Sequence, residues 1–191
     1  NDFEVNFREF HGENAPDLYP EELREEIDKL NIWLFHNVNN GVYKTAFARS
    51  KEAFWDAYNA FYAALDILEE RLVHQRFLFG DYVTDSDVRL YVTLARLDIR
   101  YAFQLGHTKQ RLIDYKNLWG YARDLYQIPA FKNNTYFKDF ANPSNKKAGH
   151  LMETFNARFL DEINFDAYWG APADRAHLSS DPGNKFKIGK R

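Results

Sequence analysis

The residues with the clearest capacity for chemistry in this sequence are its tyrosines. The chain has 12 Tyr, 17 Phe and 4 Trp among 191 residues, an aromatic share of 17%. Most of these rings should fill the core, but each phenol can also donate or accept a hydrogen bond. A cleft lined by tyrosines suits flat ligands that carry hydrogen-bonding groups. Tyrosine is therefore the first candidate for a ligand contact.

Residue types that usually carry catalysis or bind metal ions are absent or badly spaced. Without cysteine, the chain offers neither a thiol nucleophile nor thiolate metal ligands. Its nine glycines lie too far apart for a phosphate-binding or dinucleotide-binding loop. Glu69 and Glu70 project about 100° apart on a helix, which favours a solvent-exposed face over an acid/base pair. The histidines lack metal-binding spacing; they are His11, His36, His74, His107, His150 and His177. We predict no metal site and no catalytic residue within this chain.

Length and charge narrow the class of protein. A chain of 191 residues is about one domain. With 25 Lys and Arg against 28 Asp and Glu, it lacks the basic excess of a nucleic-acid-binding domain. No apolar run approaches the roughly 18 residues of a membrane span, and residues 1–10 do not resemble a secretion signal. We expect a cytoplasmic protein without nucleic-acid or membrane partners.

Helical spacing of apolar residues predicts two long antiparallel helices near the N-terminus. Pro20 and the acidic residues after it suit the first turn of a helix over residues 20–38. The sequence Asn-Asn-Gly at 39–41 should end this helix. Ser50 is a candidate N-cap for a second helix over residues 50–74. The apolar stripe of the first helix consists of Leu23, Ile27, Leu30 and Leu34.

The third predicted helix has the most specific local pattern. Thr84 and Asp87 have the spacing of a capping box, in which each side chain binds the backbone amide of the other residue. The helix that follows is apolar around most of its circumference, so it should be central and buried on nearly all sides. Arg89, Arg96 and Asp98 then need polar partners, because an unpaired buried charge is costly.

Weaker helical patterns follow, and the expected fold class is all-α. Short helices are predicted over residues 112–115, 117–126, 135–142 and 151–163. The segment from residue 170 onward is rich in Pro, Gly, Ser and Lys and is predicted to be a tail. No alternating pattern typical of paired strands occurs.

Several segments together resemble the helical C-terminal domain of the xi class of glutathione transferases, the glutathionyl-hydroquinone reductases. The capping box is shared by the wider superfamily. More specific to the class are Asn-Asn-Gly-Val-Tyr-Lys at 39–44 and Asn-Leu-Trp-Gly-Tyr at 117–121, with Arg-Asp-Leu-Tyr-Gln-Ile-Pro at 123–129. The resemblance covers about residues 15–140.

The resemblance implies a glutathione-transferase C-terminal-like helical bundle at residues 15–165. Residues 1–14 would be the remnant of an interdomain segment, and residues 166–191 a C-terminal tail. In this family a thioredoxin-like N-terminal domain, which we expect to be absent from this chain, carries the cysteine that forms a mixed disulfide with glutathione. Glutathione is therefore the implied co-substrate, bound mainly by that other domain, and this chain alone should be inactive.

The implied substrate is a glutathionylated aromatic such as a glutathionyl-hydroquinone. Tyr43 matches the family tyrosine whose hydroxyl faces the quinol; the alternative is a ring that only packs under the following loop. The family's His-Tyr-Tyr run is absent, and residues 137–144 stand in its place. Tyr136 is a weak substitute for the missing substrate contact and is more simply explained as a packing residue.

Three further residues are predicted to be structural. Thr84 and Asp87 should start the central helix. Asp98 should accept hydrogen bonds from backbone amides of the preceding loop rather than contact glutathione.

Two functions are compatible with these patterns. The first is the substrate-binding half of a glutathione-dependent transferase or reductase, and the alternative is a non-catalytic dimerisation or interaction module. The resemblance also implies a homodimer formed through the helical domain. Large aromatic side chains off the main helical stripes would line either that interface or one with the thioredoxin-like domain; they are Trp33, Phe35, Trp55 and Tyr58.

Overall fold

Helices account for nearly all the regular structure of the chain. The computed structural model describes residues 2–106, 109–141 and 162–189. Within these ranges, paired extended backbone is limited to two isolated bridges, Pro16 with Ile188 and Phe77 with Gly80. The predicted all-α class is therefore confirmed. None of the helices in this described part combines the length and hydropathy that crossing a membrane requires.

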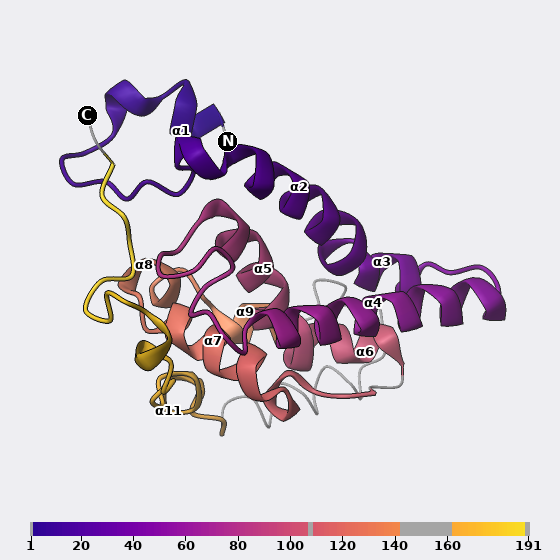
Figure 1. The fold of residues 1–191 in the computed structure, drawn as a ribbon. Coiled ribbons are helices and arrows are strands. Elements are labelled where there is room, and N and C mark those ends of the chain that lie inside the picture. The colour runs from indigo at the N-terminus through magenta and orange to yellow at the C-terminus, as the bar shows by residue number, and fades with distance from the viewer. Residues whose placement is uncertain (1, 107–108, 142–161, 190–191) are drawn as a thin grey trace.

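The helices form a bundle around α5 (Figure 1). In chain order they are α1 (Asp2–Val5), α2 (Arg24–Leu34), α3 (Gly41–Ala46), α4 (Lys51–Arg71), α5 (Asp85–Arg96), α6 (Ala102–Leu105), α7 (Lys116–Tyr126), α8 (Pro129–Lys132), α9 (Phe137–Ala141) and α11 (Phe165–Trp169). Two π-helical segments extend α2 and α5; they are η3 (Phe35–Asn39) and η4 (Leu97–Tyr101). Single 3₁₀ turns are η1 (Arg8–Phe10), η2 (Glu21–Leu23), η5 (Leu112–Asp114) and η6 (Ala176–Leu178).

The first predicted helix differs from the structure at both ends. After Pro20 the chain forms the 3₁₀ turn η2, and α2 begins only at Arg24. The predicted break lies where the structure has one, since η3 ends at Asn39 and Asn40 is a turn, but the break is short and α3 begins directly at Gly41. A Cβ atom at Gly41 would lie 3.0 Å from Cδ2 of Phe61. This glycine therefore allows α3 to pack closely on α4 instead of ending a helix.

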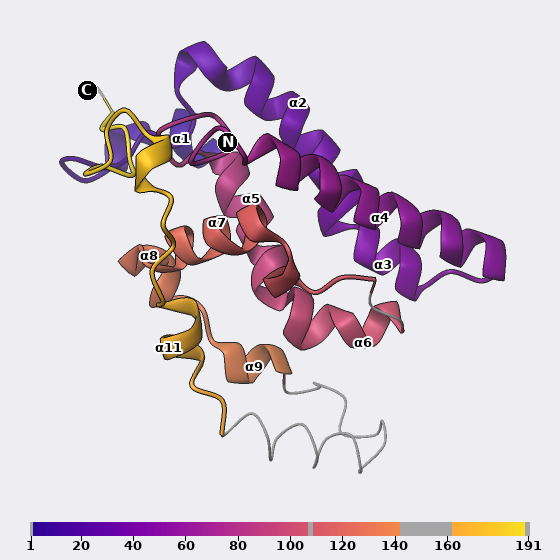
Figure 2. The ribbon, with the colours of Figure 1, turned by 60° about the horizontal axis from the view of Figure 1, so that its bottom comes forward.

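The second predicted helix is confirmed as α4. Ser50 is its N-cap, and the Ser50 hydroxyl accepts a hydrogen bond from the Ala53 amide at 3.1 Å. The α2–α3 run and α4 lie antiparallel in both views, as predicted (Figures 1 and 2). Tyr58, expected among the aromatics at an interface, is instead buried in the core.

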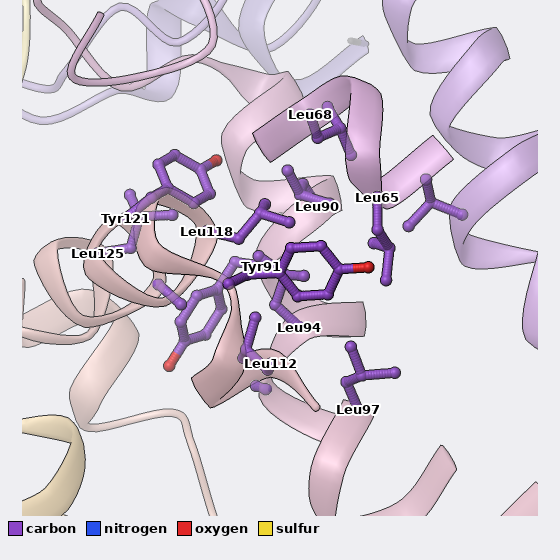
Figure 3. Close-up of a cluster of buried hydrophobic side chains, with 14 of the residues drawn as sticks. Leu65, Leu68, Leu90, Tyr91, Leu94, Leu97, Leu112, Leu118, Tyr121 and Leu125 are labelled. Atoms are coloured by element: carbon purple, nitrogen blue, oxygen red, sulfur yellow. The ribbon is translucent and has the colours of Figure 1, made fainter. Parts of the chain in front are cut away.

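Leucines of α5 form the centre of the hydrophobic core. Figure 3 shows them meeting side chains from α4 and α7: Leu65, Leu68, Leu90, Leu94, Leu118 and Leu125. The burial of α5 is less complete than predicted, since Arg89 is exposed and Val92 is 44% exposed. Arg89 pairs with Asp85, with 2.7 Å between Arg89 Nε and Asp85 Oδ2. The partner expected for this arginine is therefore on its own helix.

Glu69 of α4 binds the first turn of α7. Its carboxylate accepts hydrogen bonds from the backbone amides of Asn117 at 2.8 Å and Leu118 at 2.7 Å. The first amides of a helix lack intrahelical partners and carry partial positive charge, so a carboxylate is a suitable acceptor. The predicted solvent-exposed face is therefore wrong for Glu69, although it holds for the exposed Glu70.

Two of the remaining predicted helices are shorter than expected. The stretch 112–115 is the 3₁₀ turn η5, and 135–142 contains the shorter helix α9. The helix predicted over 117–126 is α7, which begins at Lys116. Of the helix predicted over 151–163, residues 151–161 lie outside the described part of the chain.

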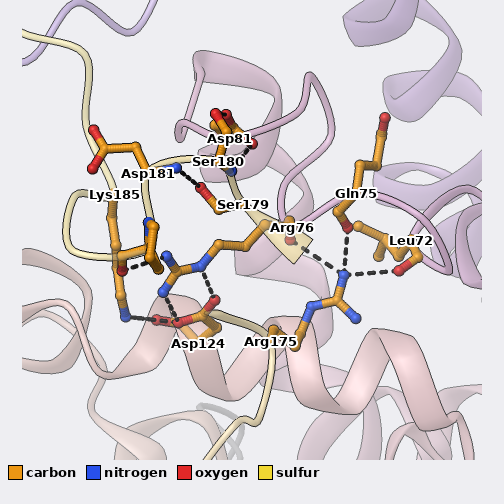
Figure 4. Close-up of polar contacts among 11 residues, drawn as sticks. Leu72, Gln75, Arg76, Asp81, Asp124, Arg175, Ser179, Ser180, Asp181 and Lys185 are labelled. Atoms are coloured by element: carbon orange, nitrogen blue, oxygen red, sulfur yellow. Dashed lines mark hydrogen bonds and ion pairs between the residues drawn. The ribbon is translucent and has the colours of Figure 1, made fainter. Parts of the chain in front are cut away.

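The segment predicted to be a tail packs against the helices. The Arg175 Nη2 atom donates to the carbonyl oxygens of Leu72 at 2.8 Å and Gln75 at 2.6 Å, just after α4 (Figure 4). Lys185 pairs with Asp124 of α7 at 2.8 Å. We call residues 170–189 the C-terminal strap. Its composition is typical of a loop, but two long basic side chains fix it to the bundle.

Candidate functional site

Tyr43 lies on α3 with its side chain half-exposed. The residue is 39% exposed, and its hydroxyl oxygen is 3.3 Å from that of Tyr101. The two rings meet edge to face, with centroids 5.9 Å apart. Tyr43 also stacks on the exposed Phe47, at a centroid distance of 6.3 Å. The ring is thus packed on one side while its hydroxyl belongs to a polar pair.

Tyr101 completes this tyrosine pair from the last position of η4. Only 7% of it is exposed, and burial together with the neighbouring Tyr43 hydroxyl raises the pKa of Tyr101 to about 12. The phenol therefore keeps its proton at neutral pH. Sequence reasoning did not single out Tyr101, because its ring simply continued the apolar pattern of the central helix.

Two π-helical segments position the pair. η3 leads into the helix that carries Tyr43, and η4 ends at Tyr101. In η3, Asn39 Nδ2 donates to the Arg89 carbonyl oxygen at 2.9 Å and to Thr93 Oγ1 at 2.7 Å, which ties this segment to α5. Such insertions in α-helices are rare and frequently lie at functional sites. They carry no periodicity signal, so the sequence could not reveal them.

The tyrosine pair can orient one oxygen of a ligand. A separation of 3.3 Å is long for a hydrogen bond between hydroxyl groups, whose usual separation is about 2.7 to 2.8 Å. Each hydroxyl thus keeps capacity for a third oxygen. When one phenol donates to the other, the second proton remains available for a ligand acceptor, and the first bond polarises it.

Tyr136 is separate from this pair. It is 60% exposed, and among the described residues no hydrogen bond or ring contact joins it to Tyr43 or Tyr101. The structure therefore does not bring the two predicted substrate-binding residues together. Tyr136 stays a prediction from the resemblance alone.

Thr84 and Asp87 form the capping box at the start of α5. One Asp87 oxygen accepts hydrogen bonds from the Thr84 amide at 2.7 Å and the Thr84 hydroxyl at 2.9 Å. The other oxygen accepts from the Leu78 amide at 2.9 Å and the Tyr121 hydroxyl at 2.7 Å. Burial raises the pKa of Asp87, while these hydrogen bonds act in the opposite direction. Asp87 thus links three parts of the bundle, more than a cap requires.

Asp98 binds backbone amides, but of a different loop from the predicted one. Its carboxylate accepts from the Leu112 amide at 2.7 Å and the Ile113 amide at 3.4 Å, both after the central helix. The expectation of a preceding loop was wrong, because Asp98 lies in η4, beyond the end of α5 and next to the chain that follows.

Two hollows elsewhere on the molecule do not include the tyrosine pair. An apolar groove of about 290 Å³ lies between α5, α8 and the strap; Val88, Tyr91, Val92, Phe131 and Phe186 are among its lining residues. A second hollow of about 50 Å³ lies beside Glu4, Arg8 and His11. Among residues 2–106, 109–141 and 162–189, no group of three His, Asp or Glu side chains is arranged to hold a metal ion.

The fold and the comparisons define the family. A bundle around a capped central helix is the arrangement of a glutathione-transferase helical domain, and residues 21–124 match the family described as "Glutathione S-transferase, C-terminal domain". The chain belongs to this family. The resemblance to its xi class is confirmed by the relatives that follow.

Three relatives show where in the family the chain lies. Glutathionyl-hydroquinone reductase YqjG of Escherichia coli is 41% identical over 131 residues, which cover 69% of this chain and 40% of that protein. A putative glutathione S-transferase from Corynebacterium glutamicum superposes with a TM-score of 0.83 at 37% identity, covering 100% of this chain and 62% of the other. Glutathione-S-transferase Xi from Phanerochaete chrysosporium superposes with a TM-score of 0.71 at 34% sequence identity. The superposition covers 81% of this chain and 53% of the other. The chain spans less than half the length of the E. coli relative.

Proposed function

We propose that this chain is the substrate-binding half of a glutathione-dependent transferase or reductase that acts on glutathionyl-aromatics such as glutathionyl-hydroquinones. The observation that carries the proposal is the tyrosine pair, a half-exposed hydroxyl supported by a buried one. The name of the E. coli relative supports the substrate class. We further propose the division into an interdomain remnant at 1–14, the helical domain at 15–165 and the segment 166–191.

The proposed reaction needs a cysteine outside this chain. Its thiolate attacks the glutathionyl sulfur, the electrons of the carbon–sulfur bond leave with the ring, and the ring carbon takes up a proton. The products are the hydroquinone and a mixed disulfide, which a second glutathione thiolate resolves to glutathione disulfide. Tyr43, supported by Tyr101, would hold a ring oxygen so that the sulfur stays aligned with the thiolate. Glutathione itself would be bound mainly by a thioredoxin-like domain, and no metal is required.

Binding measurements on the 191-residue chain test the proposal. We expect hydroquinone to bind, and Tyr43→Phe and Tyr101→Phe each to weaken binding about three- to tenfold, the range for one hydrogen bond. Tyr168→Phe, at an exposed tyrosine of α11 outside the predicted site, is the matched control and should leave binding unchanged. The chain mixed with glutathione and glutathionyl-hydroquinone should release no hydroquinone. Unchanged binding in both pair variants would refute the assignment of the site.

The alternative function is a non-catalytic dimerisation or interaction module. The exposed aromatic residues Phe35 and Trp55 favour some further contact on η3 and α4, because large rings in water are unfavourable. We propose that this contact is a homodimer of a cytoplasmic protein. Sedimentation should then give twice the chain mass over a broad concentration range. A monomer that binds no hydroquinone would argue against both functions.

A further inference from the structure

Two asparagines, one before the π-helical segment η3 and one at its end, bind the central helix α5. Asn31 of α2 donates from Nδ2 to Asp85 Oδ2 at 2.7 Å and accepts from Ser86 Oγ at 2.7 Å, both in the first turn of α5. Asn39, the last residue of η3, donates to a carbonyl oxygen and a threonine hydroxyl further along α5. The chain is therefore fixed against α5 on both sides of η3.

The π form of η3 places both asparagines on one face. Successive residues of an α-helix are turned by about 100°, so residues eight positions apart in a continuous α-helix project about 80° apart. A π-helical turn closes its hydrogen bond one residue later, and the Asn40 amide donates to the Phe35 carbonyl oxygen at 2.9 Å in this way. The extra residue reduces the angle between Asn31 and Asn39 to about 20°. Both side chains can then face α5.

The same extra residue turns Tyr43 toward Tyr101. Asn40 keeps α-helical backbone angles, with φ -90° and ψ -13°, so Asn39 and Tyr43 project about 40° apart. Tyr43 thus shares the face that binds α5, and its hydroxyl meets that of Tyr101 there. If η3 returned to α geometry, the residues after it would turn by about 100° relative to α2, and Tyr43 would leave this face.

The side chain of Asn39 opposes that return. Its Nδ2 atom lies 2.9 Å from the Arg89 carbonyl oxygen and 2.7 Å from Thr93 Oγ1, and Thr93 is only 2% exposed. Turning Asn39 away would break both contacts and take a donor from a buried hydroxyl, which is unfavourable. Because π-helical turns are rare, α geometry is ordinarily preferred, and the contacts of Asn39 act against that preference.

We propose that Asn39 is a positioning residue for the substrate: it holds η3 in the π form that turns Tyr43 toward Tyr101. This inference rests on the proposed function and names the residue that keeps its binding group in place. Asn39 has its amide nitrogen committed to α5 and does not contact the ligand. Its effect on ligand binding therefore passes through Tyr43.

A double-variant comparison tests this dependence. In the 191-residue chain, Asn39→Ala should weaken hydroquinone binding about three- to tenfold, as much as Tyr43→Phe does. Adding Tyr43→Phe to Asn39→Ala should weaken binding no further, because the hydroxyl has already turned away. The NOE between the rings of Tyr43 and Tyr101, whose centroids are 5.9 Å apart, should disappear in Asn39→Ala.

Asn37 offers a matched control in the same segment. Its Nδ2 atom donates to the Trp33 carbonyl oxygen of its own helix at 2.9 Å and not to α5. Asn37→Ala should therefore leave hydroquinone binding and the ring NOE unchanged. A residue that only stabilised the bundle would lower stability without abolishing the effect of Tyr43→Phe.

The role of Asn39 can be tested separately from the function of the site. A full effect of Tyr43→Phe in the Asn39→Ala background, or a retained ring NOE, would overturn the positioning role and leave the binding site intact. If the wild-type chain bound no hydroquinone, the proposed function would be contradicted, and the ring NOE would decide whether Asn39 places Tyr43. Should Asn39→Ala fail to fold, Thr93→Val removes one of the two contacts and takes its place, while Thr93→Ser keeps the hydroxyl and should behave as wild type.

Discussion

Asp87 shows how much of this fold depends on a single buried carboxylate. The side chain is inaccessible to solvent and receives four hydrogen bonds, from the loop before α5, from the N-cap of α5 and from Tyr121 of α7. The donors of these bonds lie in the interior of the bundle and lose their acceptor when the carboxylate is removed. The contribution of Asp87 to stability therefore depends on all the hydrogen-bond donors that it satisfies and not on its capping role alone.

Replacing Asp87 should cost more than the loss of an N-cap. Asp87→Ala leaves the Leu78 amide, the Thr84 amide and the Tyr121 hydroxyl buried and unpaired, so we expect the free energy of unfolding to fall by about 3 kcal/mol or more, against about 1 kcal/mol for a cap. Urea denaturation measures this difference. Thr84→Ser keeps the hydroxyl and should change stability by less than about 1 kcal/mol. A fall in the free energy of unfolding of less than about 1 kcal/mol for Asp87→Ala would contradict this prediction.

Asp124 should make stability depend on pH. Burial would raise the pKa of Asp124, but hydrogen bonds and charge from Arg76 and Lys185 outweigh it and hold the pKa below its ordinary value. Its contribution to stability is thus complete above the ordinary pKa of about 3.9 and is lost as pH falls through the lower folded-state value. We expect Asp124→Asn to be strongly destabilised at pH 7 and the gap to wild type to narrow below about pH 4. A gap that is constant with pH would contradict this.

At the scale of elements, Arg175 is one of the two basic side chains that fix the C-terminal strap to the bundle, and it binds the chain just after α4. Arg175 donates to the carbonyl oxygens of Leu72, Gln75 and Arg76, and Figure 4 shows these bonds converging on one nitrogen. Carbonyl groups at a helix end lack intrahelical partners and carry partial negative charge. Leu72 is the C-cap residue of α4 and Gln75 and Arg76 follow it in the loop, so Arg175 binds both the end of the helix and the loop after it.

Removing this anchor should loosen the strap. We expect Arg175→Ala to lower the free energy of unfolding by about 1 to 3 kcal/mol, because buried carbonyls lose their donor, and to speed hydrogen exchange over residues 176–189. Lys187 lies on the same strap and forms an exposed ion pair with Glu22 near the start of α2. Lys187→Ala removes this pair and should lower the free energy of unfolding by less than about 1 kcal/mol. Equal effects of the two substitutions would show that the strap has no specific anchor at Arg175.

Adjacent glutamates offer a second test at this scale. Glu69→Gln weakens the carboxylate contact with the first amides of α7 and should cost about 1 to 2 kcal/mol of unfolding free energy, while Glu70→Gln one position away should be nearly neutral. Thermal melting of both variants gives the comparison. A Glu70→Gln effect as large as that of Glu69→Gln would point to net charge instead of capping.

The sequence predicted those elements whose signals are local. Examples are the N-cap at Ser50, the capping box of Thr84 and Asp87, and the apolar period of α4 and α5. In each of them the residues that form the signal are only a few positions apart in the sequence. The misses depend on distant partners. Gly41 is explained only by Phe61, and the strap only by contacts between Arg175 and residues about 100 positions earlier. Of the two residues in the candidate site, Tyr43 could be found from the family resemblance. Tyr101 could not, because the π-helical segment that places it beside Tyr43 has no sequence signature.

At the scale of the whole molecule, the bundle presents its tyrosine pair on an open side. Tyr43 is half-exposed, and neither of the two hollows described above is lined by Tyr43 or Tyr101. The apolar groove at Tyr91 and Phe131 is the competing location for an aromatic ligand, since it is a hollow of about 290 Å³ lined mainly by apolar side chains.

The central claim is that an aromatic ligand binds at the tyrosine pair, and intermolecular NOEs test it most directly. Hydroquinone would be added to the chain with isotope-labelled tyrosine and phenylalanine rings, with signals assigned through Tyr43→Phe and Tyr101→Phe. We predict NOEs from the hydroquinone ring protons to the rings of Tyr43 and Tyr101. NOEs to Tyr91 and Phe131, with none to Tyr43 and Tyr101, would place the ligand in the apolar groove and contradict the account.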